Sequence, residues 1–560
     1  MSPARPFAPW AASWKATAVL VLGVLAVRLV YLAFACRYTL IEDEAHYWEW
    51  SRRLALSYYT KGPGIAWVIA ACTHLLGDSV FAIRLTAPIS SAIGAWFTAS
   101  LAGEIAEDRR AGFVAAACWT LAPMFQALGL IITIDGPYSA CWAMAAWATW
   151  RAVGRGQSWA WVVVGAALGI GTLFKYTMLL FIPALVVLWI RSRPAHKGVV
   201  RGAAARLAPL MGLLAFAACL LPIAVWNQRE GWPTVRHLLG HLGVAGGDVT
   251  PTQGVNGWHY SPLWTLSFLG TLAASLGPIL VLAVMGGLAS WRGRRANAAR
   301  WSRDGFLIVP AAFMLGFYFI VSFIAEPEGN WALAGQISLF SLAAGYVVRG
   351  MDAWREKLGA WRALPSPRPK AGFFVRRPET PVQMLWYATV ALGVAVALAI
   401  PDLSLVQRTP LVGRFVPVHR FTGADAIAAR IARLMDDLRA REQGEPFVIT
   451  THYGRASQMA YYLPGRPVVF NAGSLMGTRK TQYDYWPDTN LRSPAVMEAL
   501  HGRSAVALGG TRKDWLRAFA RVEPVASLGV NIKKSPPTYL CSGYRGFAAK
   551  PTNDAPATNP

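Results

Sequence analysis

Long apolar runs constrain this chain more than any other feature of its sequence. One run reads AVLVLGVLAVRLVYLAFA and another reads DGFLIVPAAFMLGFYFIVSFIA. Each comes close to the roughly 20 residues that an α-helix needs to cross a bilayer. Charged residues make up only 15% of the chain, whereas soluble domains carry about a quarter. The sequence therefore predicts an α-helical polytopic membrane protein.

The apolar runs continue to about residue 401 and predict a transmembrane domain over residues 1–401, with about 11 to 13 helices. The expected spans cover residues 16–36, 80–103, 111–128, 136–152, 159–174, 177–190, 207–226, 262–290, 306–324, 331–350 and 382–401.

The basic residues divide unequally between alternate connections of these spans. One set of connections holds 24 lysines and arginines and the other set holds 7. Because positively charged connections stay in the cytoplasm, we expect a cytoplasmic N-terminus in the inner (plasma) membrane and an external C-terminal region. Contact with anionic lipids accounts for much of the net charge of +25. Nothing resembles a nucleic-acid-binding module, so no nucleic-acid partner is expected.

The sequence changes character after residue 401. ADAIAARIARLMDDLRAREQ has the pattern of an amphipathic helix, and PFVITT, RPVVFNA and SAVALGG read as short strands. These patterns predict a small α/β external domain over residues 402–545, followed by a disordered tail over 546–560. The six cysteines show no paired spacing, so they predict neither a disulfide framework nor a metal site.

The first external connection, residues 37–79, contains IEDEAHYWEWSRRLALSYYTKGPG. Asp43 and Glu44 follow the first span by a few residues, and Tyr47 belongs to a segment that suits the membrane interface. These carboxylates are either solvent-exposed residues of a loop or functional groups. Adjacent like charges beside aromatic rings are unfavourable, which supports a functional role. Lys61 follows in a glycine- and proline-rich setting.

Three further polar segments interrupt the apolar pattern. Asp135 stands in a tight connection before Gly-Pro, where it suits a functional acid and equally a turn or helix cap. Lys175 separates two apolar runs, so it must reach the headgroups or meet an anion, and Arg84 near a span end raises the same question. The turn AEPEGNWALAG adds Glu326, Asn330 and Trp331.

Acids and cations are thus expected together at one membrane face. Lysines can hold a phosphate as point charges, and a carboxylate can remove a proton from a hydroxyl. This combination favours a reaction on a lipid-linked phosphate. A transporter would more often place its charges near the middle of its spans, in symmetric halves.

Several of these segments together resemble a known family. DEAHYWEWSRRLALSYYTKGPGIAW is similar to the first external loop of bacterial members of the dolichyl-phosphate-mannose-protein mannosyltransferase superfamily, the polyprenyl-phosphate-dependent GT-C glycosyltransferases (glycosyltransferase family 39-like). LIITIDGPYSACWAMA, LGIGTLFKYTMLLFIP, PIAVWNQREGWPTVRHLLGH and EPEGNWALAGQISL resemble later family segments in the same order. HYGRASQMAYYLPGRPVVFNAG and RKTQYDYWP resemble a soluble segment of many bacterial members, so the resemblance extends to about residue 490.

The resemblance implies a GT-C fold and a glycosyltransferase that uses a polyprenyl-phosphate sugar donor. It implies that Asp43 is the catalytic base, with Glu44 and Asp135 as further functional acids, whereas Glu42 is expected to stay solvated. Lys61, Lys175 and Arg84 would hold the donor phosphate. The residues expected to contact the acceptor or sugar are Tyr47, Tyr59, Glu326, Asn330, Trp331, Tyr483 and Asp484. No metal is obligatory; a divalent cation, if one binds, would be held by Asp43, Glu44, Asp135 or Glu326.

Two departures from the family pattern stand out. Gly62-Pro63-Gly64 replaces the more common Pro-Pro after the lysine, and Glu326-Pro327-Glu328-Gly329 is one residue longer than the pattern before Asn330. The expected reaction is an inverting in-line transfer to an acceptor hydroxyl on a lipid, glycan or protein. The alternatives are a flippase or transporter of a lipid-linked sugar, and a non-catalytic scaffold. Tyr483 and Trp486 either contact sugar or pack the C-terminal domain.

Overall fold

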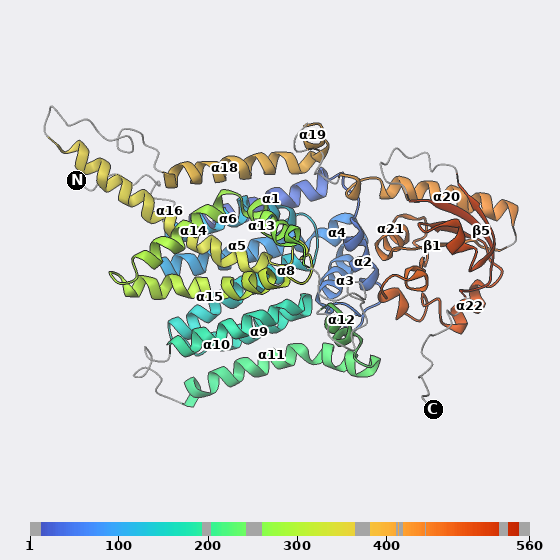
Figure 1. Ribbon diagram of the computed structural model, residues 1–560, viewed down its shortest axis with the longest axis horizontal. Helices are drawn as coiled ribbons and strands as arrows, with labels where there is room; N and C mark the ends of the chain where they lie inside the picture. The colour runs from blue at the N-terminus through green and yellow to red at the C-terminus, as the bar shows by residue number, and fades with distance from the viewer. Residues whose placement is uncertain are drawn as a thin grey trace. The chain divides into compact units, whose positions relative to one another are not determined.

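The computed structural model describes residues 13–192, 203–241, 260–364, 381–409, 413, 418–442, 444–525 and 536–547. It divides the chain into two compact units. The membrane unit comprises residues 1–36, 61–228 and 252–405, and the loop–sheet unit comprises residues 37–60, 229–251 and 406–560. The chain crosses from one unit to the other several times (Figure 1). Most of the tail expected over 546–560 lies outside the described residues.

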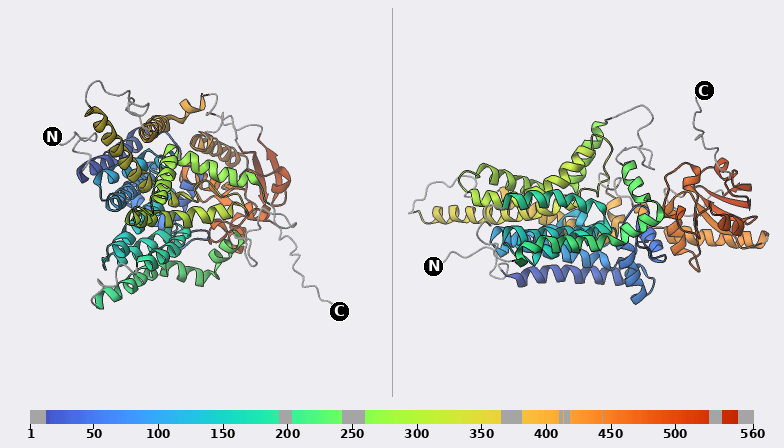
Figure 2. Two further views of the ribbon diagram at one scale, coloured as in Figure 1. Left: turned by 60° about the vertical axis from the view of Figure 1, so that its left-hand side comes forward. Right: turned by 90° about the horizontal axis from the view of Figure 1, so that it is seen from below.

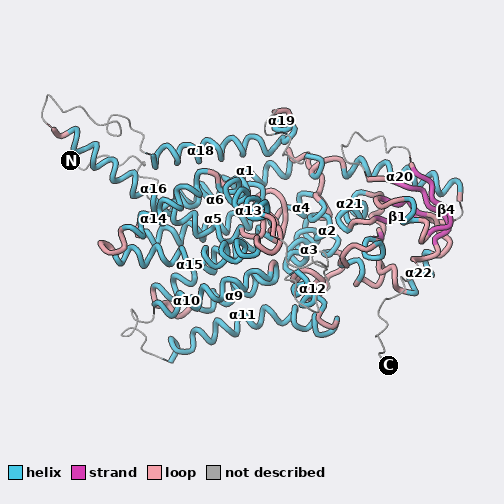
Figure 3. The backbone as a smooth tube through the Cα atoms, in the orientation of Figure 1, coloured by secondary structure: helices cyan, strands magenta, loops and turns pink. Residues whose placement is uncertain are grey.

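The membrane unit consists of helices, which Figure 3 shows in cyan. They are α1 (Trp14–Phe34), α3 (Gly64–Leu76), α4 (Val80–Arg84), α5 (Thr86–Ala106), α6 (Arg109–Leu121), α7 (Pro123–Leu128), α8 (Asp135–Thr149), the π-helical turn η2 (Trp150–Gly154), α9 (Ala160–Phe174), η3 (Tyr176–Leu180), α10 (Phe181–Ser192), α11 (Ala203–Glu230), α13 (Pro262–Leu276), α14 (Pro278–Arg292), α15 (Ala298–Val321), α16 (Leu333–Arg362), α18 (Pro381–Ala399), η5 (Ile400–Asp402) and α19 (Leu403–Gln407).

Small residues let the central helices of this unit approach closely. Helices α5, α8 and α16 pack against one another, and α6 packs against α5 and α16. Figure 2 shows the helices of this unit bundled side by side. A Cβ atom at Gly94 of α5 would lie 2.3 Å from the indole ring of Trp119 on α6. Because lipid provides no hydrophobic force between helices, such close packing is the usual source of their cohesion. The predicted α-helical architecture with a small C-terminal sheet is confirmed.

Among the described residues, five helical stretches are long and apolar enough to cross a membrane by themselves. They are Trp14–Phe34, Val80–Ala106, Arg206–Glu230, Ala298–Val321 and Pro381–Asp402. Several other expected spans are helices that are shorter or less apolar. The span expected over 262–290 is not one continuous helix, because α13 and α14 meet at an angle of 98°. Gly277, with a φ of 57°, follows the last residue of α13, and Pro278 begins α14. Glycine favours the end of a helix and proline favours its start.

One end of the membrane unit carries arginines that pair with acids. Arg151, just beyond α8, pairs with Glu104 at 2.6 Å, and Arg110 pairs with Asp352 at 2.6 Å. Asp135 starts α8, so Arg151 lies at the opposite end of that helix. An α-helix rises about 1.5 Å per residue, so Asp352 lies roughly 30 Å along α16 from its first turn. We name this arginine-rich side the basic end of the membrane unit.

The loop–sheet unit contains a five-stranded mixed sheet with the order β2-β1-β3-β5-β4. Strand β1 is parallel to β2 and β3, whereas β5 is antiparallel to β3 and β4. Its elements are α2 (Glu42–Ser51), α12 (Pro233–His241), η7 (Val418–Arg420), α20 (Ala424–Arg441), β1 (Phe447–Thr450), α21 (Tyr453–Tyr462), β2 (Phe470–Asn471), η8 (Gly473–Met476), η9 (Gln482–Asp484), α22 (Pro494–Leu500), β3 (Ala505–Leu508), α23 (Arg512–Trp515), β4 (Phe519–Pro524) and β5 (Thr538–Tyr544).

The amphipathic helix expected after residue 401 is α20, and the three expected strands are β1, β2 and β3. Every residue of β1 and β3 is buried, as expected for parallel strands covered on both faces. Phe447 of β1 packs with Phe470, Phe519 and Tyr544 in the core. The unit also includes residues 37–60, which the sequence assigned to the transmembrane domain. Packing of α2 against α21 accounts for this difference.

Candidate active site

In the membrane unit, three of the predicted site residues meet in one cluster. Asp135 is 1% exposed, and its Oδ1 atom accepts a hydrogen bond of 2.7 Å from Lys175 Nζ. Its Oδ2 atom accepts a second bond, also 2.7 Å, from Asn330 Nδ2. We call Asp135, Lys175 and Asn330 the lysine cluster. The three residues come from three separate segments of the chain, and the structure brings them together.

Helix termini position the charges of the lysine cluster. Asp135 is the first residue of α8, where the partial positive charge of the helix N-terminus favours a carboxylate. Lys175 follows the last residue of α9, where the partial negative charge favours an ammonium group. Lys175 Nζ also lies 5.6 Å from the ring centroid of Tyr138, one turn along α8, within the range of a cation–π contact. The buried lysine is therefore paired with a carboxylate and held in one direction.

The segment that carries Lys61 makes a close backbone contact with the end of α9. A Cβ atom at Gly62 would lie 2.3 Å from the carbonyl oxygen of Leu173, and one at Gly64 would lie 3.1 Å from the same oxygen. Leu173 is in the last turn of α9, two residues before Lys175. The segments that carry Lys61 and Lys175 therefore touch. This contact gives a physical reason for the glycines that replace the more common Pro-Pro.

The remaining predicted residues of the membrane unit have other surroundings. Arg84, at the end of α4, is 2% exposed, and its Nη1 atom donates to Cys36 Sγ at 3.3 Å. Glu326 is exposed. The half-buried Trp331 lies with its ring centroid 5.7 Å from that of Tyr318. The roles proposed for Arg84, Glu326 and Trp331 stay predictions.

In the loop–sheet unit, the three adjacent acids of α2 have three different environments. Asp43 is exposed, and its Oδ1 atom accepts a hydrogen bond of 3.2 Å from the Tyr453 hydroxyl. Glu44 is fully buried and accepts a bond from the backbone N–H of Ile41 at 3.0 Å, which holds the first turn of α2. Glu42 lies 3.6 Å from Arg455 Nη2. The expectation that Glu42 is merely solvated is therefore wrong, because α21 supplies a cationic partner.

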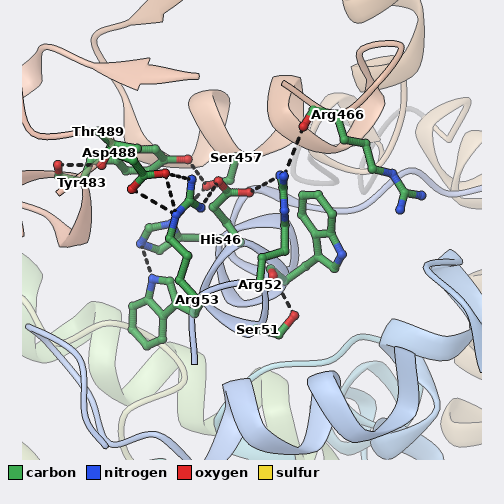
Figure 4. Close-up of polar contacts among 12 residues, drawn as sticks. His46, Ser51, Arg52, Arg53, Ser457, Arg466, Tyr483, Asp488 and Thr489 are labelled. Atoms are coloured by element: carbon green, nitrogen blue, oxygen red, sulfur yellow. Dashed lines mark hydrogen bonds and ion pairs between the residues drawn. The ribbon is translucent and has the colours of Figure 1, made fainter. Parts of the chain in front are cut away.

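A buried hydrogen-bond chain joins α2 to α21 (Figure 4). The Trp50 indole donates to His46 Nε2 at 3.1 Å, and His46 Nδ1 lies 3.0 Å from Ser457 Oγ. Ser457 Oγ also lies 2.9 Å from the Tyr483 hydroxyl. An indole N–H can only donate, so His46 Nε2 accepts and His46 Nδ1 carries the ring proton. His46 is therefore neutral in this arrangement.

An ion-pair network joins the other end of α2 to the segment after η9 (Figure 4). The fully buried Glu49 pairs with Arg53 at 2.5 Å and with Arg52 at 3.2 Å. Arg53 also pairs with Asp488 at 2.6 Å, and Arg52 donates to the Arg466 carbonyl at 3.2 Å. Breaking a buried pair on one side typically costs several kcal/mol, so these contacts fix the position of α2 within the unit.

Four residues that were expected to contact sugar are in the interior of the loop–sheet unit. Tyr47 packs edge-on against Trp50, and the fully buried Tyr59 lies between His237 and Tyr485. Tyr483 is 1% exposed. The Asp484 carboxylate accepts bonds from the Thr481 amide at 2.8 Å and from Arg492 at 2.7 Å. These positions favour packing roles, and sugar contact by Tyr47, Tyr59, Tyr483 and Asp484 stays a prediction.

Sequence reasoning missed the polar residues at the start of α21. His452, Tyr453 and Arg455 face Glu42 and Asp43. Burial raises the pKa of Tyr453, and the Asp43 charge adds to that effect. The sequence did carry a signal for them, because polar residues begin a helix directly after a predicted strand. Ligands of open α/β sheets bind at the carboxyl ends of such strands.

The residues suspected as metal ligands do not converge in the described part of the chain. No three His, Cys, Asp or Glu side chains gather there in a way that could hold a metal ion. Asp43 and Glu44 belong to the loop–sheet unit, whereas Asp135 and Glu326 belong to the membrane unit. Metal dependence stays a prediction.

Comparison with known proteins identifies the relatives of this chain. A family model described as dolichyl-phosphate-mannose-protein mannosyltransferase matches residues 60–229. The lipid A galacturonosyltransferase RgtD of Rhizobium johnstonii is 27% identical over 57% of this chain and 63% of its own length. The undecaprenyl phosphate-alpha-4-amino-4-deoxy-L-arabinose arabinosyl transferase of Pseudomonas savastanoi pv. phaseolicola is 27% identical over 38% of each chain.

The chain thus spans less than two thirds of the length of these curated relatives. Among solved structures, ArnT from Cupriavidus metallidurans bound to undecaprenyl phosphate shares the fold, with a TM-score of 0.59 and 16% identity. That match covers 94% of this chain and 98% of ArnT. This chain is thus similar to the dolichyl-phosphate-mannose-protein mannosyltransferases over residues 60–229, and it shares its overall fold with ArnT.

Proposed function

We propose that this protein is a multi-pass membrane glycosyltransferase that moves a sugar from a polyprenyl-phosphate donor to an acceptor hydroxyl. The lysine cluster is the observation that carries the proposal. The relatives add support: one is named for an undecaprenyl-phosphate-linked aminoarabinose, and ArnT was solved with undecaprenyl phosphate bound. The acceptor hydroxyl belongs to a lipid, a glycan or a protein.

Lys175 is the group best suited to hold the donor phosphate. An ammonium group has three N–H donors, and one of them goes to Asp135. The other two meet no oxygen or nitrogen acceptor among the described residues, although Nζ also lies near the Tyr138 ring. A phosphate oxygen would satisfy them. A preorganised cation at the position where charge develops on the leaving phosphate lowers the barrier to transfer.

Asp135 then acts as a positioning residue rather than a base. Both of its carboxylate oxygens accept hydrogen bonds, one from Lys175 and one from Asn330. A general base must be able to receive a proton from the acceptor hydroxyl, and an ion-paired, buried carboxylate is poorly suited to that task. We propose that Lys61 also holds the donor phosphate, because Gly62 brings the backbone next to Lys61 against the end of α9.

Asp43 is the proposed base. It is exposed and lies in the first turn of α2. The acceptor oxygen attacks the anomeric carbon as the bond between that carbon and the phosphate oxygen breaks. Asp43 takes the acceptor proton, and the polyprenyl phosphate leaves with the electron pair. The attack occurs opposite the leaving group, so the configuration at the anomeric carbon inverts.

The charge distribution of the membrane unit supports the proposed orientation. The arginines of the basic end lie at the opposite end of α8 from Asp135. Basic connections stay in the cytoplasm, so the lysine cluster would face the external side, where lipid-linked sugars would be used. We therefore propose a cytoplasmic N-terminus and an external C-terminal region.

The test uses the full chain in lipid nanodiscs with synthetic undecaprenyl-phosphate sugars. Mass spectrometry follows both the release of undecaprenyl phosphate and the sugar-bearing product. Lys175→Ala should raise the KM for the donor about tenfold or more, because one phosphate ligand is lost. Lys357→Ala, an exposed lysine on α16, is the matched control and should have no effect.

Two results would refute the proposal. One is an unchanged KM and kcat for Lys175→Ala with a donor that the wild-type protein consumes. The other is movement of the labelled donor across a proteoliposome membrane without any sugar transfer, which would establish the flippase alternative.

A further inference from the structure

We propose that Tyr453, the first residue of α21, positions the Asp43 carboxylate, so that the C-terminal α/β region is part of the catalytic apparatus. The inference rests on the proposed function, in which Asp43 is the base. Tyr453 itself is a positioning residue because it acts through Asp43 rather than on the substrate.

The Tyr453 hydroxyl is held in place by its surroundings. It donates to Asp43 Oδ1 at 3.2 Å. The ring centroid of Tyr453 lies 4.6 Å from those of both His46 and His452. The guanidinium carbon of Arg479 lies 5.8 Å from the same ring. Three neighbours therefore restrict the ring, and its hydroxyl presents a fixed donor to the carboxylate.

Tyr453 also remains a hydrogen-bond donor over the working pH range. Burial raises the pKa of the phenol above its ordinary value, and the negative charge of Asp43 raises it further. A phenol protonated at neutral pH donates to a carboxylate, and bonds to charged acceptors are roughly twice as strong as neutral ones.

Other contacts hold the first turn of α2 against the first turn of α21. Glu42 lies 3.6 Å from Arg455 and 4.0 Å from His452. A Cβ atom at Gly454 would lie 2.4 Å from the Cβ atom of Glu42, so the two helices approach at a distance that only glycine allows. Gln458 Nε2 donates to the Leu40 carbonyl at 2.8 Å. The Asp43–Tyr453 bond is thus one of several contacts along a shared face.

The location of this contact in the sheet is informative. Strand β1 lies between β2 and β3, and the chain moves to opposite sides of β1 in its two successive crossovers. Open α/β sheets bind ligands at the carboxyl ends of the strands where the strand order reverses. Here α21 starts directly after β1, and the acidic first turn of α2 lies against it. The edge at which open α/β sheets usually bind ligands here holds the first turn of α2, which carries the proposed base.

Positioning matters because Asp43 is exposed. A base must lie within hydrogen-bond reach of the proton that it removes, and small misplacements of a reacting group are costly. A carboxylate that turns freely in water would meet the acceptor hydroxyl in the productive geometry for a small fraction of the time. The bond from Tyr453 to one carboxylate oxygen restricts that rotation.

The experiment compares Tyr453→Phe with the wild-type protein in the nanodisc assay. The substitution removes the hydroxyl and keeps the ring between its neighbours. We expect kcat to fall about tenfold, as for loss of one hydrogen bond to a charged group, with the donor KM changed less than about twofold. Tyr539→Phe, which removes a hydroxyl on β5 from the same unit, is the matched control and should keep the wild-type kcat.

A double-mutant cycle with Asp43→Asn separates positioning from general stability. If Tyr453 acts through Asp43, Tyr453→Phe lowers kcat in the wild-type background and has no further effect on the residual rate of Asp43→Asn. An equal loss in both backgrounds, or no loss in either, overturns the inference. Full activity of Asp43→Asn itself would instead overturn the proposed base, so the two failures are distinguishable.

A second variant keeps the inference testable if Tyr453→Phe fails to fold. Glu42→Gln removes the charge pair with Arg455 and retains the side-chain length. It should lower kcat severalfold in the wild-type background alone, because the first turn of α2 is then held less firmly. An unchanged kcat overturns the inference.

Discussion

The contact between Gly62 and α9 allows a sharp test of how Lys61 is placed. In Gly62→Ala the new Cβ atom would lie 2.3 Å from the Leu173 carbonyl oxygen, 2.8 Å from its carbonyl carbon and 2.9 Å from its Cα atom. All three are backbone atoms, so no side chain can rotate away. Ordinary contact begins at 3.4 Å, and the loop or the end of α9 must therefore move by about 1 Å.

The magnitude follows from that displacement. Overpacking of this kind typically costs about 1–3 kcal/mol in stability. A shift of about 1 Å in a group that positions a substrate can cost roughly a hundredfold in rate. We therefore expect Gly62→Ala to fold, to unfold at a lower temperature, and to lose between about tenfold and a hundredfold in kcat/KM for the donor.

The assay is donor turnover in nanodiscs, with thermal unfolding measured on the same preparations. Gly23→Ala on α1 is the matched control, since a Cβ atom there meets nothing within 4 Å, and alanine is the better helix former. A wild-type rate and stability for Gly62→Ala would refute the reasoning that this glycine sets the approach of Lys61 to the lysine cluster.

Three further predictions follow from the same structure. Asp135→Asn leaves Lys175 without its carboxylate, so it should raise the donor KM and destabilise the protein by about 3–5 kcal/mol. Adding Lys175→Met to this variant should restore stability but not activity. Unfolding curves measure the stability of both variants, and donor kinetics measure their activity. Gly454→Ala should push α2 away from α21 and lower kcat about tenfold or more, and a wild-type kcat would contradict this placement. A cysteine at the exposed Asp436, in a chain lacking its native cysteines, should react with an impermeant maleimide on intact cells. A cysteine at Lys357 should react after lysis alone, and the reverse pattern would overturn the orientation.

Local sequence patterns were enough to predict the helical class of the membrane unit. The amphipathic pattern of α20 and the apolar segments of β1, β2 and β3 also appear where the sequence indicated them. These predictions succeed because hydropathy and periodicity depend on neighbouring residues. The bend between α13 and α14 was missed although Gly277 and Pro278 signal it, because the apolar run on both sides continues across the break.

The site could be predicted in part. Asp135, Lys175 and Asn330 were each selected as polar residues at span ends, and the structure brings these three together. The aromatic residues were less informative. The sequence does not distinguish whether Tyr59 and Tyr483 pack in a core or stack on a sugar. A tyrosine has an apolar ring and a polar hydroxyl, and both suit either role.

The sequence by itself determined that this chain forms a helical membrane protein with acids and lysines in its connections, since transfer of a helix into lipid depends on the length and apolarity of one continuous segment. The tertiary structure alone decided which charges meet. The bond between Asp135 and Asn330 joins residues 195 positions apart, and the bond between Tyr453 and Asp43 spans 410 positions. Such pairings depend on how helices pack and on where a sheet presents its edge, and no local pattern encodes either.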